Sequence, residues 1–139
     1  ALLAGSPLET AVLSNRAGDA SALKMVFAAF SKGSAALTAE ILNVAEQYGV
    51  RKPLSEAIGQ KITAQWHRSL AGTASKAWRF KGEMQEIAET FDAVGAEPGF
   101  HQAAAAVYQK LSVHKDWETK PELSSLLASL ANGKSPKPN

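Results

Sequence analysis

One stretch with a long apolar periodicity constrains this chain more than any other feature. Between Gly18 and Tyr48, large apolar side chains recur at steps of three and four residues: Leu23, Val26, Phe27, Phe30, Leu37, Ile41, Val44 and Tyr48. At ~3.6 residues per turn, this spacing predicts one long helix of roughly eight turns with a single apolar face. Gly18 and Asp19 are a start signal and Gly49 is a stop. We expect this apolar face to point into the core.

A second line of residues on the same helix carries one lysine. Lys24, Ala28, Ser31 and Ala35 fall nearly on one line, so that an ammonium group stands beside a row of small side chains. This row could form the floor of a pocket, and a desolvated lysine near a helix N-terminus suits acid-base chemistry. From spacing alone, a lysine with its head in water is the better interpretation.

The rest of the chain also reads mainly as helix. Apolar periodicity and glycine or proline breaks predict further helices over about 54–70, 74–94, 100–111 and 121–130. In the second of these helices, we expect Ile58, Ile62 and Trp66 to point inward. Leu8 to Leu13 could be one strand, and 132–139 reads as a disordered tail. The expected fold class is all-α, with about five helices.

Composition excludes several classes of function. With 139 residues and 45% hydrophobic content, the chain suffices for one globular domain. The net charge is +2 and the basic residues are scattered, which argues against binding to nucleic acid. There is no cysteine, and His67, His101 and His114 lie too far apart for a typical metal motif, so we expect no metal. No uninterrupted apolar run approaches the ~18 residues of a membrane span, so we expect a soluble protein that does not enter a membrane.

Several motifs together resemble a known family. They are Gly18 to Met25, Ala28 to Gly33, Lys76 to Phe91, and Gly99 to His101. As a set, they resemble the C-terminal helical domain of NAD(P)-dependent oxidoreductases in the 6-phosphogluconate dehydrogenase and 3-hydroxyisobutyrate dehydrogenase superfamily. In particular, they resemble the branch that is often described as having a phosphogluconate-dehydrogenase-like C-terminal domain of unknown function. Residues 1–17 resemble the last helix and strand of that superfamily's Rossmann domain, and 18–131 its helical domain.

The resemblance implies a function and a set of site residues. NAD or NADP would be held mainly by a Rossmann domain preceding this chain, and hydride transfer would be accompanied by lysine-assisted proton transfer. The lysine of the superfamily maps onto Lys24 as the catalytic residue. Ser21, Lys32 and Trp78 would lie near the substrate, and Glu83 and Met84 near the cofactor. The resemblance also implies a cytoplasmic homodimer that binds a small-molecule substrate.

A second interpretation stays open. Where the superfamily commonly has an asparagine one turn after the lysine, this chain has Ala28, and Ser31 stands where the phosphogluconate enzymes have a catalytic glutamate. The domain could therefore be a non-catalytic dimerisation or protein-interaction module. Because the chain starts at Ala1 without a methionine, we expect it to be a fragment of a longer protein, inactive as a dehydrogenase by itself.

Overall fold

The computed structural model describes residues 16–132, which fold into helices without any strand. In chain order these are α1 (Asp19–Gln47), α2 (Arg51–Ile58), α3 (Gln60–Ala74), α4 (Ala77–Ala93), α5 (Gly99–Leu111), a 3-10 turn (Ser112–His114) and α6 (Leu123–Asn132). The predicted all-α class is confirmed. The predicted strand at Leu8 to Leu13 lies outside the described residues, as does nearly all of the predicted tail.

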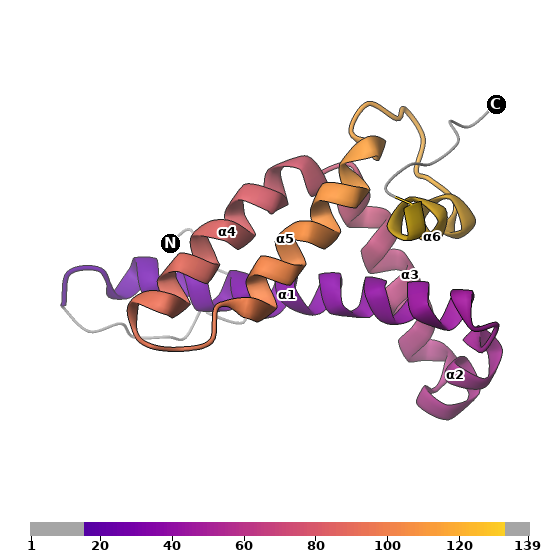
Figure 1. Ribbon diagram of the computed structural model, residues 1–139, viewed down its shortest axis with the longest axis horizontal. Helices are drawn as coiled ribbons and strands as arrows, with labels where there is room; N and C mark the ends of the chain where they lie inside the picture. The colour runs from indigo at the N-terminus through magenta and orange to yellow at the C-terminus, as the bar shows by residue number, and fades with distance from the viewer. Residues whose placement is uncertain (1–15, 133–139) are drawn as a thin grey trace.

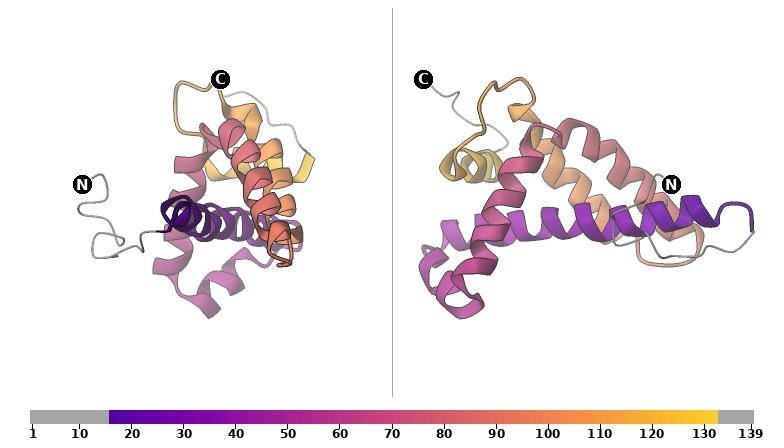
Figure 2. Two further views of the ribbon diagram at one scale, coloured as in Figure 1. Left: turned by 90° about the vertical axis from the view of Figure 1, so that its left-hand side faces the viewer. Right: turned by 180° about the vertical axis from the view of Figure 1, so that it is seen from behind.

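Helix α1 is the longest element, and α4 and α5 lie side by side and cross it obliquely (Figure 1). Helices α2 and α3 pack against its C-terminal end, and α6 closes the bundle near the end of α5 (Figures 1 and 2). The core lies where these helices meet, and its largest fully buried side chains include Leu42, Met84, Ile87, Tyr108, Leu111 and Leu126. The Phe80 and Tyr108 rings pack edge to face, with centroids 5.4 Å apart.

The buried side of α1 is not the side predicted from its large apolar residues. Its buried positions carry mainly small side chains: Ala29, Ala36, Ala39, Leu42, Asn43 and Ala45. Most of the residues predicted to point inward are exposed instead: Val26, Phe27, Phe30, Leu37, Val44 and Tyr48. The physical reason is that alanine lets neighbouring helices approach α1 closely, whereas the bulky residues occupy another side of it.

The predicted helix over 54–70 is two helices in the structure. Gly59 separates α2 from α3 with a φ angle of 107°, which disfavours any residue with a side chain. Helix α3 then continues through Gly72, where a break was predicted, and ends at Ala74. Trp66 is half-buried against the core as predicted, whereas Ile62 is exposed. Because of this division, the described residues contain six α-helices instead of about five.

Candidate functional site

The proposed catalytic residue Lys24 lies on the N-terminal turns of α1, near which α4 ends (Figure 1). Lys24 and Ser21 are both exposed, and within residues 16–132 neither side chain forms a hydrogen bond or ion pair. Both groups are therefore available to a ligand or a neighbouring domain. The described part of the chain does not enclose them.

Lys32 and Glu83 are two predicted site residues that the fold brings together. The Lys32 ammonium on α1 donates to Glu83 Oε2 on α4, and Lys32 Nζ lies 4.4 Å from the centre of the Phe80 ring. The side chains are 26% and 41% exposed, respectively. Solvent screening therefore limits what the ion pair contributes to stability, although both groups remain reachable from solvent.

Tyr108 contacts the backbone of Lys32 in this pair and was not predicted as a site residue. Its hydroxyl donates to the backbone carbonyl of Lys32 at 2.6 Å. Burial, and then the nearby Glu83 carboxylate, raise the pKa of Tyr108, so that it remains a neutral donor linking α5 to α1. A lone tyrosine in an alanine-rich helix was the available sequence signal, because a buried phenol usually finds a hydrogen-bond partner.

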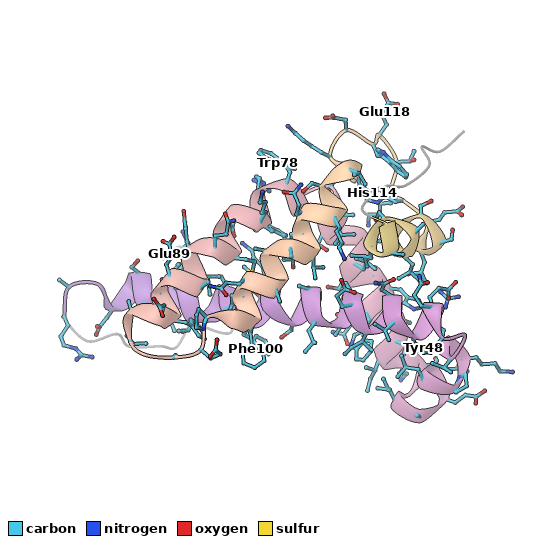
Figure 3. The ribbon with its side chains drawn as sticks, in the orientation of Figure 1. Tyr48, Trp78, Glu89, Phe100, His114 and Glu118 are labelled. Atoms are coloured by element: carbon cyan, nitrogen blue, oxygen red, sulfur yellow. The ribbon has the colours of Figure 1, made fainter. Side chains whose placement is uncertain are left out.

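The other two predicted site residues do not join the pair. Trp78 is 47% exposed near the start of α4, and its ring faces the ammonium of Lys115 at 4.5 Å (Figure 3). Met84 is fully buried in the core. Of the two residues predicted to bind the cofactor, only Glu83 is accessible to solvent.

A cavity of about 440 Å³ runs between α1 and α5, on a different side of α1 from Lys24. It is lined mostly by small side chains (Ala29, Gly33, Ser34, Ala36, Ala103 and Ala104), with Leu37, Glu40, Phe100, His101 and Val107. The predicted pocket floor of Ala28, Ser31 and Ala35 is not part of this lining.

His101 forms one wall of the cavity. Its Nε2 lies 3.3 Å from the carbonyl of Ala29, and because a carbonyl only accepts, Nε2 carries the proton. Nδ1 is then an acceptor, buried without a partner among the described residues. A Cβ on Gly33 would come within 3.1 Å of Nε2, so the absent side chain of Gly33 allows the two helices this close approach.

Residues 16–132 contain no cluster of three histidine or carboxylate side chains that could hold a metal ion. By length and composition alone, α1 could also cross a membrane, a property it shares with core helices of soluble proteins.

Comparison with known proteins gives a match for part of the chain. No curated protein and no solved structure matches the chain significantly. A family model does match residues 45–111, a segment that includes Trp78, Glu83 and His101 but begins after Lys24 and Lys32. From the last turn of α1 to the end of α5, the chain is therefore similar to the family described as a domain of unknown function, DUF1932.

Proposed function

We propose that this chain is the C-terminal substrate-binding and dimerisation domain of an NAD(P)-dependent oxidoreductase in the 6-phosphogluconate dehydrogenase and 3-hydroxyisobutyrate dehydrogenase superfamily. The match to DUF1932 supports a dehydrogenase-associated domain, together with the motifs that resemble this superfamily. The observation that carries the proposal is the exposure of Lys24 and Ser21 near the N-terminal end of α1. Such an end suits a cleft that a second domain completes.

The two lysines on this side of the domain have different chemical capacities. Lys32 is held by Glu83 and by the Phe80 ring, so its charge is largely compensated. Lys24 has no such partner within 16–132, so its ammonium is free to attract an anionic substrate or to exchange a proton with a substrate oxygen. Ser21 lies almost one turn before Lys24 and could donate a hydrogen bond to the same substrate. Water would have to be excluded when a neighbouring domain closes over these groups.

The described residues do not by themselves fit a dinucleotide. Met84 lies in the core, Glu83 is already paired with Lys32, and residues 16–132 contain no strand that could lead into a glycine-rich phosphate-binding turn. The proposal therefore assigns only substrate-side groups to this chain. The dinucleotide, NAD or NADP, would be bound by a Rossmann domain.

The test is a lysine substitution in a protein that joins a dinucleotide-binding domain to this chain. With 3-hydroxyisobutyrate and 6-phosphogluconate as probes, we expect Lys24→Met to lower kcat by about 10²- to 10⁴-fold, the usual contribution of a general acid or base. Lys61→Met is the matched control, because Lys61 is an exposed lysine on α3. Equal activity of the Lys24 and Lys61 variants would refute the catalytic role.

The exposed apolar side of α1 favours a second candidate, a non-catalytic interaction module. Ala28 and Ser31, which replace polar residues of the superfamily's site, are compatible with it. This candidate predicts that Lys24→Met leaves the activity of the joined protein unchanged, which the same assay measures.

A further inference from the structure

The exposed apolar side of α1 has the period of a coiled coil. Eight positions follow one another at alternating steps of four and three residues: Leu23, Phe27, Phe30, Ser34, Leu37, Ile41, Val44 and Tyr48. We call these eight residues the α1 seam. A strict repeat of 3.5 residues over this length suits pairing with another helix, whereas packing into a globular core requires no such regularity.

The described part of this chain leaves the α1 seam largely uncovered. Phe30 is 71%, Leu37 62% and Tyr48 79% exposed. Helices α4 and α5 lie on one side of α1, both in Figure 1 and in the end-on view of Figure 2. With the neighbouring Val26 and Phe100, the apolar surface is on the order of 800 Å², which exceeds the largest patch of a typical monomer and equals one side of a standard protein interface.

We propose that the α1 seam pairs with the α1 seam of a second copy of this chain, antiparallel, about a two-fold axis between Ser34 and Leu37. This pairing specifies the surface through which the proposed dimer forms, and it rests on the proposed function only in assuming that the domain dimerises. In this register, each seam residue meets the partner's residue that lies at the same distance from the axis on its other side. Leu23 faces the partner's Tyr48, Phe27 the partner's Val44, Phe30 the partner's Ile41, and Ser34 the partner's Leu37.

The sizes of the paired side chains favour this arrangement. Three of the four pairs join an aromatic residue to a smaller aliphatic one, and the fourth joins the small Ser34 to leucine. Packing of large against small side chains fills a helix interface evenly. A parallel pair would instead place each residue against itself, with Phe27 on phenylalanine and Ser34 on serine. In that arrangement the phenylalanine layers would be crowded, whereas the serine layer would be polar and poorly filled.

The cavity between α1 and α5 lies at the middle of the α1 seam. Ser34 and Leu37, the residues next to the proposed axis, are part of its lining, and Phe100 is an exposed part of its wall. A partner helix crossing at this point would cover Leu37 and Phe100 together. The surface that would be buried therefore extends from α1 onto α5.

The first experiment measures the association of the 139-residue chain by sedimentation velocity over a range of concentrations. We expect a dimer, and we expect Phe30→Glu and Leu37→Glu to weaken it. Truncating one interface hot spot weakens affinity by about 30-fold. Because a symmetric dimer contains each substituted residue twice, the two losses multiply, and each variant should raise the Kd by on the order of a thousand-fold.

Val94→Glu is the matched control, because Val94 is 80% exposed but lies outside α1. It should leave the dimer unchanged. Circular dichroism of each variant separates a lost interface from a lost fold. A wild-type chain that sediments as a monomer at high concentration, or a dimer that survives both seam substitutions, overturns the proposal.

Cross-linking tests the antiparallel register, and the absence of native cysteine makes each introduced thiol unique. In an antiparallel dimer of one Phe27→Cys chain and one Val44→Cys chain, the two introduced thiols lie next to each other. In an antiparallel dimer of two copies of the same variant, the two thiols lie about 26 Å apart along the helix. We therefore expect disulfide-linked dimers from a mixture of the two variants. Cross-links within each variant alone would show parallel pairing and refute the register.

Lipid is the rival occupant of this surface. If the chain floats with vesicles of phosphatidylcholine and phosphatidylglycerol, and Leu37→Glu abolishes flotation while the free chain remains monomeric, the proposal is wrong. None of these measurements depends on dehydrogenase activity. A monomeric chain would thus refute the seam pairing, whereas an inactive joined protein would refute only the catalytic part of the proposed function.

Discussion

At the residue scale, His114 shows how a buried imidazole can make this fold sensitive to pH. His114 and Ser129 are both fully buried, with His114 Nε2 lying 3.0 Å from Ser129 Oγ (Figure 3). Because Ser129 donates its own proton to the carbonyl of Leu126 at 2.7 Å, Nε2 must be the donor to Ser129. Nδ1 is left buried without a partner among the described residues. Burial accordingly lowers the pKa of His114.

This lowered pKa predicts a loss of stability in mild acid. Between the lowered pKa of the folded protein and about 6.5, the unfolded chain binds more protons than the folded one. The free energy of unfolding should therefore fall as the pH drops below about 6.5, by at most about 1.4 kcal/mol per pH unit for one proton. His114→Gln should flatten this dependence in urea unfolding between about pH 7.5 and pH 5.

His67→Gln provides the comparison for that prediction. Burial, and then the charge of Arg51, also lower the pKa of His67, so His67 acts in the same pH range. His67 is half-buried, however, whereas His114 is fully buried, so its substitution should flatten the dependence less. If His114→Gln retained the wild-type pH dependence, the buried imidazole would not be its source.

At the element scale, Gly59 decides where α2 ends and α3 begins. Its φ of 107° and ψ of 135° lie in a region that side chains make costly. We predict that Gly59→Ala lowers the free energy of unfolding by about 1–3 kcal/mol in urea denaturation, although an added Cβ would meet nothing within 4 Å. The cost would thus come from the backbone alone.

Gly72→Ala is the matched control for Gly59→Ala. Gly72 lies inside α3, and a Cβ there would also meet nothing within 4 Å. Since alanine is the better helix former, this variant should gain up to about 1 kcal/mol. A gain at both glycines would mean that α2 and α3 can merge into one helix, as the sequence alone suggested.

The same two glycines show what could be predicted about the fold. Periodicity located the helices well, and the predicted helix over 100–111 is almost the same as α5. It did not distinguish Gly59 from Gly72, because local sequence marks both as weak points of a helix. The difference is tertiary. At the Gly59 break, Thr63 of α3 is buried and its hydroxyl lies 2.8 Å from that of Ser55 in α2, a contact that the bend makes possible.

The candidate site was predictable only in part for a similar reason. The resemblance singled out both Lys32 and Glu83, but their pairing joins residues 51 positions apart and depends on how α1 packs against α4. Lys24 was predicted as catalytic, and its role stays a prediction. The contribution of Tyr108 to the same cluster could not be read from periodicity, since core tyrosines and site tyrosines have the same spacing.

At the scale of the whole molecule, the side that α1 turns to its own core differs from the side predicted from its apolar periodicity. A helix with one apolar face must bury that face, but periodicity does not say against which surface. In this fold the alanine-rich side of α1 contacts α4 and α5, while Phe30 and Leu37 remain exposed. A helix that is apolar on both sides suits a protein with two sets of neighbours, its own helices and a partner subunit.

Coupling of folding to association yields the last prediction. If only the folded chain pairs through the α1 seam, the dimer stabilises the fold by mass action, and its Tm depends on protein concentration. A hundredfold dilution above the Kd should cost about 2.7 kcal/mol per dimer, which corresponds to a Tm lower by a few degrees. The Tm of Leu37→Glu should instead be independent of concentration, and should approach the value of the diluted wild type. Scanning calorimetry or fluorescence measures both proteins, with Val94→Glu expected to follow the wild type. A wild-type Tm that does not change on dilution, in a range where sedimentation shows dissociation, would mean that pairing and folding are not coupled through α1.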